Sequence, residues 1–223
     1  MKQIGITQRV EVFPDHYERR DCLDQGWTAL FERLDCDLLP IPNNHSDIVS
    51  WAKRKQLDGL VLSGGNDLAH LPSAQHIAPE RDTTEQALLD WASKVMIPVL
   101  GVCRGMQMLN VWLGGKLEPV VGHVACRHLV WPCENIQLSY AELFGYYEVN
   151  SFHNWCITPS GLAVNLVPYV KASDGSIEAF MHATLPWVGV MWHPERNNED
   201  STALDLALLQ YLFNQETRIK NQE

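Results

Sequence analysis

Short apolar runs alternate with helical patterns along most of this chain. Strand-like runs cover residues 3–7, 36–41, 57–63, 97–103, 146–152, 177–182 and 187–193. Helical periodicity covers residues 22–35, 46–55, 83–94, 104–113 and 201–215. Near-continuously apolar strands that alternate with helices are typical of parallel sheets buried on both faces. We therefore predict an α/β fold: an open, mostly parallel central sheet with helices on both faces.

The middle of the chain, residues 116–180, is richer in strand signals, and we expect it to supply a small antiparallel extension. No repeat, low-complexity segment or linker divides the sequence. Residues 1–223 are therefore predicted to form one domain, which is long enough to bury a full core. In open α/β sheets ligands bind beyond the carboxyl ends of the strands, so functional residues are expected where the strands stop.

Charge and composition narrow the classes of partner. The formal net charge of -10 repels phosphate backbones and anionic lipids, so we expect neither nucleic acid nor a membrane as a partner. The N-terminus lacks a signal-peptide pattern, no apolar run approaches the ~20 residues of a membrane helix, and the six cysteines follow no framework spacing. These features favour a cytoplasmic protein with reduced thiols, and they leave a homodimer open.

One cysteine stands where the strand at 97–103 changes into the helix at 104–113. The stretch GVCRG is a thiol version of the G-x-S-x-G nucleophile elbow, because flanking glycines permit a tight, strained turn. A helix N-terminus favours the thiolate, and Arg104 would add to this effect if its side chain points inward. Cys103 is therefore a candidate nucleophile, with a buried structural cysteine as the alternative.

A nucleophilic thiol needs a base, and His193 ends the last apolar run. In an extended stretch residues two apart share a side. His193 and Glu195 are thus expected to face one site, with the carboxylate holding the imidazole in its working tautomer.

Acyl transfer also requires donors aimed at the developing oxyanion. The run SGGND follows the strand at 57–63, and its glycines, Gly64 and Gly65, can turn backbone amides toward a ligand. The amide of Arg104, next after the candidate nucleophile, would be the second donor. An ordinary glycine turn is the alternative for this loop.

The order SGGND, GVCRGMQ, VNSFHN, WHPE resembles the class I glutamine amidotransferase superfamily, and more closely its γ-glutamyl hydrolase branch. The resemblance covers about residues 57–196 and implies a flavodoxin-like fold. It implies that Cys103 is the nucleophile, His193 the general base and Glu195 the orienting acid.

The same resemblance implies a set of substrate-binding residues. Gln107, one helical turn after the elbow, would contact the glutamyl group. The segment VNSFHN resembles the family's N-S-x-H substrate loop and contributes Asn150, Ser151 and His153. A purely structural histidine is the alternative for His153.

Five stretches are similar to one subgroup, the γ-glutamyl-CDP-amidate hydrolases, which act in making the phosphoramidate decoration of capsular polysaccharide: ERRDCLDQGW, LSGGNDL, VNSFHN, SDGSIEAF and GVMWHPER. A diphosphate leaving group calls for guanidinium partners. Arg19, Arg20 and Arg196 are the candidates, with surface ion pairs as the alternative. The resemblance thus implies hydrolysis of a γ-glutamyl amide, preferentially γ-glutamyl-CDP-amidate.

Three other functions remain open. One is hydrolysis of γ-glutamyl-γ-aminobutyrate in polyamine breakdown. Another is a glutaminase subunit that supplies ammonia to a synthase, although GGND stands here where such glutaminases usually show a Gly-Gly-Pro run. The last is a ligand sensor without catalysis, which the intact Cys103, His193 and Glu195 disfavour.

Two histidines and two cysteines gather in GHVACRHLVWPC, residues 122–133. Their spacing, H-x2-C-x-H-x4-C, matches no standard zinc motif, and alternation along a strand would scatter the ligands. No phosphate-binding G-x-x-x-x-G-K-[ST] loop is present. We therefore expect no metal and no organic cofactor.

Overall fold

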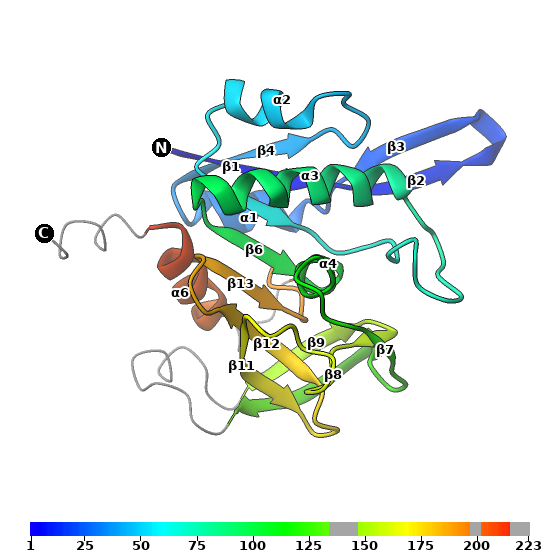
Figure 1. The fold of residues 1–223 in the computed structure, drawn as a ribbon, viewed down its shortest axis with the longest axis vertical. Coiled ribbons are helices and arrows are strands. Elements are labelled where there is room, and N and C mark those ends of the chain that lie inside the picture. Colours follow the sequence, from blue (N-terminus) through cyan, green and yellow to red (C-terminus); the bar gives the residue numbers. More distant parts are fainter. Residues whose placement is uncertain (134–146, 197–201, 215–223) are drawn as a thin grey trace, which may run out of the picture.

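The computed structural model describes residues 1–133, 147–196 and 202–214. Residues 146, 201 and 215, at the ends of elements expected from the sequence, lie outside the described residues. The first half of the chain contains β1 (Lys2–Thr7), β2 (Arg9–Phe13), a 3-10 helix (Pro14–His16), β3 (Glu18–Cys22), α1 (Gly26–Glu32), β4 (Cys36–Ile41), α2 (Ile48–Arg54), β5 (Gly59–Leu62), α3 (Pro79–Val95), β6 (Val99–Val102) and α4 (Arg104–Trp112) (Figure 1). The second half contains β7 (Glu118–Pro119), β8 (Val124–Pro132), β9 (Tyr147–Phe152), β10 (Trp155–Cys156), β11 (Leu166–Ala172), β12 (Ile177–His182), β13 (Trp187–Val190) and α6 (Thr202–Phe213).

A nine-stranded sheet runs through the molecule in the order β4-β1-β5-β6-β13-β12-β11-β8-β9. The strands from β4 to β13 pair in parallel, and those from β13 to β9 pair antiparallel. The predicted α/β fold with a parallel central sheet is confirmed. The antiparallel extension is continuous with that sheet and adds four strands to it.

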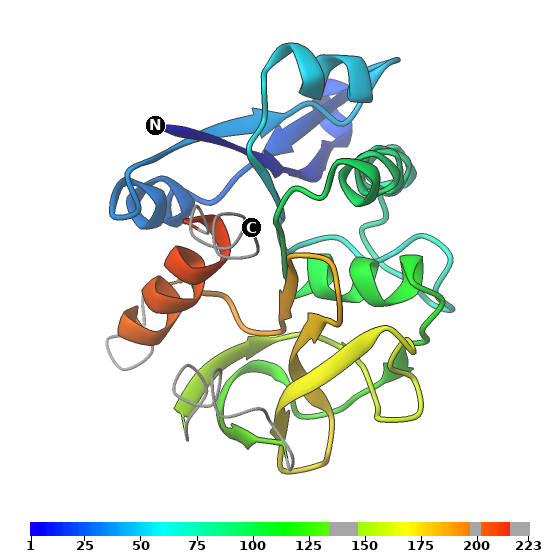
Figure 2. The same ribbon diagram turned by 60° about the vertical axis from the view of Figure 1, so that its left-hand side comes forward.

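Helices cover both faces of the parallel strands, as the alternating pattern predicts. On one face α1 and α6 pack against Ile4, Val61 and Val102. On the other, α2, α3 and α4 pack against Leu60 and Leu62. The two groups lie on opposite sides of the sheet in Figure 2. Neighbouring strand residues thus point to opposite cores, which is why these strands are apolar throughout.

Four parallel strands end at the same edge of the sheet and position the candidate site. β1 ends at Thr7, β5 at Leu62, β6 at Val102 and β13 at Val190. A separate two-stranded hairpin, β2 with β3, extends beyond this edge (Figure 1). None of the described helices combines the length and apolar character needed to cross a membrane.

Candidate active site

Cys103 occupies a strained turn between β6 and α4. Its backbone has φ 50° and ψ -106°, outside the regions that non-glycine residues usually adopt. The Cys103 amide donates to the Val190 carbonyl (2.8 Å), and its carbonyl accepts from the Gln107 amide (3.0 Å). A Cβ on Gly105 would lie 1.9 Å from the Leu62 carbonyl oxygen, so only glycine allows α4 to start this close to β5. These contacts form the elbow that the GVCRG pattern predicts.

His193 and Glu195 contact each other from a turn rather than from an extended strand. β13 ends at Val190, three residues before His193. The Nδ1 atom of His193 lies 2.7 Å from Glu195 Oε1, and both residues are buried. Asn150 holds this turn from both sides, because its Oδ1 accepts from the His193 amide (2.9 Å) and its Nδ2 donates to the His193 carbonyl (2.9 Å). Asn150 thereby positions the imidazole through the backbone.

The electrostatics of His193 indicate a charged imidazole. Burial alone would lower its pKa, but the negative charge of Cys103 and a hydrogen bond to it, together with the hydrogen bond and charge of Glu195, raise the pKa to about 9. Cys103 and Glu195 therefore contact one imidazole, in the order thiol, imidazole, carboxylate. This arrangement can form a thiolate and donate a proton at neutral pH.

The glycine-rich loop after β5 is held by a buried arginine that sequence reasoning missed. Arg81 of α3 donates to the carbonyls of Ser63 (2.5 Å), Gly64 (3.0 Å) and Gly65 (2.6 Å). The carbonyl and N–H of a trans peptide point in opposite directions, so the following amides are turned away from Arg81. The Asn66 side chain links the end of the loop to β2, because it accepts a hydrogen bond from the Val10 amide and donates one to the Val10 carbonyl.

Arg81 belongs to a network of buried charges beneath the site. Its Nε lies 2.9 Å from Glu85 Oε1, and both side chains are fully buried. Arg104 points into this network and pairs with Glu85 and Asp82. Its positive charge is therefore balanced by the carboxylates beside it, and its backbone amide stands at the start of α4. Thr7 donates to the same Glu85 oxygen (2.7 Å) and links β1 to the network.

A cavity of about 170 Å³ opens beside the thiol. It is lined by residues that include Gly65, Cys103, Gln107, His153 and Trp155. The Nε2 atom of Gln107 donates to the Trp155 carbonyl (3.0 Å), which fixes the amide at the cavity wall. A second cavity of about 440 Å³ shares four lining residues with the first, Asp67, Gln75, Asn154 and Trp155, so the hollow continues past the thiol.

The structure brings some of the remaining predicted residues to this cavity and leaves others elsewhere. Ser151 is buried and donates to the His123 carbonyl (2.7 Å), so its hydroxyl forms a backbone hydrogen bond within the antiparallel extension. Arg19 and Arg20 lie on the β2–β3 hairpin, where Arg19 pairs with Glu80 of α3 and Arg20 pairs with Glu18. Neither arginine lines the cavity. Arg196 packs its guanidinium 4.6 Å from the ring centre of Phe152, a cavity residue.

Comparisons with known proteins show which proteins this chain is similar to. The sequence model of the Peptidase C26 family matches residues 3–195. The chain is 34% identical over 196 residues to the γ-glutamyl-CDP-amidate hydrolase of Campylobacter jejuni, covering 87% of this chain and 90% of that protein. It is 32% identical over 218 residues to a glutamine amidotransferase-like protein of Lactococcus lactis, covering 87% of this chain and 91% of that one.

A solved structure of a glutamine amidotransferase from Thermotoga maritima covers 100% of this chain and 86% of its own, with a TM-score of 0.64 at 16% identity. At this identity the likeness concerns the fold. The family match spans the elbow, the glycine-rich loop and the turn that carries His193 and Glu195. The chain therefore belongs to the Peptidase C26 family and has the class I glutamine amidotransferase fold.

Proposed function

We propose that this chain hydrolyses a γ-glutamyl amide bond through a thioester on Cys103. The observation that carries the proposal is the buried His193–Glu195 pair that contacts Cys103 at the carboxyl edge of the parallel strands. The family match and the identity to a γ-glutamyl-CDP-amidate hydrolase support a glutamine amidotransferase-like γ-glutamyl hydrolase.

In this mechanism the Cys103 thiolate attacks the γ-carbonyl carbon, and the carbonyl electron pair moves to oxygen. As the tetrahedral intermediate collapses, the C–N bond breaks and the His193 imidazolium gives its proton to the departing nitrogen. The neutral imidazole then takes a proton from water, which attacks the thioester. The C–S bond breaks, glutamate leaves, and Glu195 keeps the imidazole oriented in both steps.

The oxyanion is assigned to backbone donors. The amides of Gly64 and Gly65 are turned away from Arg81, as described above, and the amide of Arg104 stands at the start of α4. Loss of one such donor costs about 3–4 kcal/mol in related acyl transfer. The position of this loop is therefore expected to affect the rate of hydrolysis almost as much as the reacting side chains do.

Replacing Gly64 with alanine is expected to lower kcat by about 100-fold while the fold is preserved. An added Cβ would lie 2.6 Å from Cε1 of His193, so the imidazole must move, and a shift of about 1 Å can cost 10²-fold. The measurement is glutamate release alongside urea unfolding. Gly5→Ala is the matched control, because its Cβ would meet the core side chains of Leu57 and Ile41 and should cost stability alone. An unchanged kcat in Gly64→Ala would contradict the assigned position of the imidazole.

Activity is expected to fall at alkaline pH as His193 loses its proton. The imidazolium is present below its pKa of about 9, so kcat/KM should decline through that pH. Glu195→Gln removes a charge that raises this pKa, and the decline should move to lower pH by about 1 unit or more. A pH–rate profile measures the shift, with Glu32→Gln, an exposed acid, as the control. A profile that stays in place in Glu195→Gln would show that another group donates the proton.

The preferred substrate is proposed to be γ-glutamyl-CDP-amidate, which would place the chain in making the phosphoramidate decoration of capsular polysaccharide. The second cavity, contiguous with the one at Cys103, offers room for a leaving group larger than ammonia. Arg196, stacked beside Phe152, is the cation next to the cavity that we assign to the diphosphate. The relative of that name supports this choice over other γ-glutamyl amides.

The test compares three substrates on the isolated chain: γ-glutamyl-CDP-amidate, γ-glutamyl-γ-aminobutyrate and glutamine. The proposal expects kcat/KM to be highest for the first. Faster hydrolysis of the second would favour polyamine breakdown. Activity toward glutamine that appears only with a synthase partner would favour a glutaminase subunit.

Arginine variants then separate the cationic partners of the diphosphate. Arg196→Ala is expected to raise KM for γ-glutamyl-CDP-amidate about tenfold or more and to leave KM for γ-glutamyl-γ-aminobutyrate unchanged, because removing a charge-assisted hydrogen bond costs about 1.5–3 kcal/mol. The same rise in Arg19→Ala or Arg20→Ala, with none in Arg196→Ala, would assign the diphosphate to the hairpin instead.

A further inference from the structure

Three buried side chains converge in the antiparallel extension, behind the wall of the cavity. His123 precedes β8, His153 follows β9 and Glu178 lies on β12. His123 Nδ1 is 3.3 Å from His153 Nε2 and 3.8 Å from Glu178 Oε1, and His153 Nε2 is 3.6 Å from the same Glu178 oxygen. The proposed hydrolysis gives this cluster no role.

The outer nitrogens of both imidazoles are engaged by groups that can only accept a hydrogen bond. His123 Nε2 lies 3.0 Å from a carboxylate oxygen of Asp174, and His153 Nδ1 lies 3.0 Å from the Trp155 carbonyl. These outer nitrogens therefore carry the protons. In neutral rings the two inner nitrogens, His123 Nδ1 and His153 Nε2, are unprotonated and each presents a lone pair. Lone pairs that face each other at 3.3 Å cannot hydrogen-bond, and the Glu178 carboxylate beside them is another acceptor.

Three converging acceptors require a cation between them, which is either a proton or a metal ion. One proton can join only two of the three acceptor atoms, whereas a metal ion can bind all three at once. The three atoms lie within 3.8 Å of one another, so their convergence favours a metal ion.

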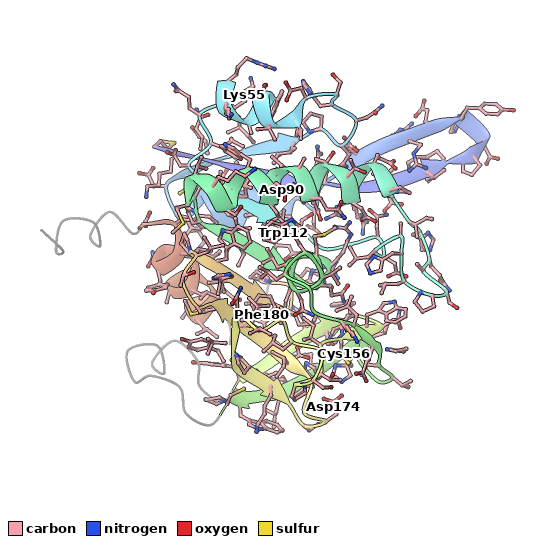
Figure 3. The ribbon with its side chains drawn as sticks, viewed as in Figure 1. Lys55, Asp90, Trp112, Cys156, Asp174 and Phe180 are labelled. Atoms are coloured by element: carbon pink, nitrogen blue, oxygen red, sulfur yellow. The ribbon has the colours of Figure 1, made fainter. Side chains whose placement is uncertain are left out.

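The distances suit tetrahedral coordination. Ligands at 2.0–2.1 Å from a zinc ion stand about 3.4 Å apart, and the three separations in this cluster are 3.3, 3.6 and 3.8 Å. Metal-bound histidines almost always donate their other N–H to a carboxylate or a backbone carbonyl. Asp174, at the turn between β11 and β12 (Figure 3), and the Trp155 carbonyl occupy these two outer positions.

A further pair of buried atoms faces the same carboxylate. His128 Nε2 lies 3.4 Å from Glu178 Oε2, and in the part of the chain that the structure describes neither atom has a hydrogen-bond partner. Buried polar atoms without partners are rare and call for an explanation such as a bound ion. His128 stands where it can orient Glu178 once that carboxylate binds a cation.

We propose that His123 Nδ1, His153 Nε2 and Glu178 Oε1 bind one divalent ion of the zinc class. The ion ties together three segments of the extension, and through His153 it supports the wall of the cavity. It takes no part in the proposed hydrolysis. The ligands come from segments far apart in sequence, whereas the local motif at 122–133 contributes only His123 as a ligand and His128 as a neighbour.

The test is a titration of the metal-free full-length chain with Zn²⁺ against a chromophoric chelator. It uses a Cys103→Ser background, so that the reactive thiol cannot be the ligand. We expect one equivalent bound and a melting temperature that rises with Zn²⁺ concentration. Glu178→Gln should weaken binding by more than about 100-fold and Asp174→Asn by about 10- to 100-fold, because loss of an outer partner alone costs that much. His70→Ala, which removes an exposed histidine, should bind as the background does.

Equal Zn²⁺ affinity in Glu178→Gln and the background would overturn the proposal, as would the absence of binding in the background. If Glu178→Gln does not fold, Co²⁺ bound to the background chain decides. A visible spectrum of tetrahedral type without a thiolate band supports the assigned ligands. No visible band, or a thiolate band, refutes them.

Discussion

Replacing Cys103 with alanine is expected to lower kcat for γ-glutamyl hydrolysis by about 10⁴- to 10⁶-fold. The sulfur forms the only covalent bond to substrate in the proposed mechanism, so no neighbouring side chain can replace it. His193→Ala should lose nearly as much, because the imidazole both generates the thiolate and donates the proton. The double variant should be no slower than either single variant, since groups that act as a unit lose their effect together. Glutamate release under single-turnover conditions measures all three.

Cys133→Ala is the matched control for these variants. Its thiol is half-buried, and burial raises its pKa despite the opposing charge of Lys171, so it should be inert. It does not line the cavity at Cys103, and its loss should leave kcat unchanged. Substantial activity in Cys103→Ala would place the nucleophile elsewhere. A double variant slower by the product of the two single effects would show that thiol and imidazole act independently.

Strand and helix bounds follow closely from the sequence wherever a buried apolar run has sharp ends. β4 and β12 occupy the predicted residues 36–41 and 177–182, because Asp35 and Pro42 flank the first run and the turn residues SDGS precede the second. α3 begins at Pro79, four residues before its expected start at 83. Proline at the first helical position and acidic residues in the first turn favour this earlier start.

The β2–β3 hairpin escaped prediction because little of it is buried. β3 reads ERRDC, and four of its five side chains are exposed, so it carries no apolar face that periodicity could reveal. Its stability comes from pairing with β2 and from contacts such as Arg20 over the ring of Phe13 at 4.4 Å. Such cross-strand contacts can be predicted only when the partner strand and its register are known.

The side chains to which we assign the reaction could be named from the sequence because each lies in a local motif, whereas the buried residues that hold the glycine-rich loop could not. Cys103 follows from the glycine pattern, and His193 with Glu195 from the end of the last apolar run. In the sequence, Arg81 and Glu85 resemble an exposed i,i+4 pair in PERDTTEQ, which is usually a solvated helix face. Their burial results from packing α3 beneath the loop after β5, a tertiary contact that no spacing encodes.

Replacing Arg81 with methionine is expected to lower the free energy of unfolding by about 3–5 kcal/mol, because it removes one of the two cationic partners of the buried Glu85 carboxylate and the donor to three loop carbonyls. Methionine retains much of the apolar volume but leaves the carbonyls of Ser63, Gly64 and Gly65 without this donor. Glu85 keeps Thr7 and Arg104 and loses one of its two cationic partners. The loop should lose its orientation, and kcat should fall with stability. Urea unfolding and glutamate release measure the two effects, with the exposed Arg33→Met expected to change unfolding by less than about 0.5 kcal/mol.

A second substitution distinguishes loss of the buried charge from loss of packing. Adding Glu85→Gln to Arg81→Met removes the carboxylate that has lost one of its two cationic partners, so the double variant should be less destabilised than the sum of the single effects. Its kcat should remain low, because the glutamine cannot restore a donor to the three loop carbonyls. Arg81→Lys keeps the charge but not the planar fork that contacts several acceptors at once, and it should be intermediate in both measurements. If kcat recovers together with stability in the double variant, the arginine serves folding alone and the loop amides are oriented by other contacts.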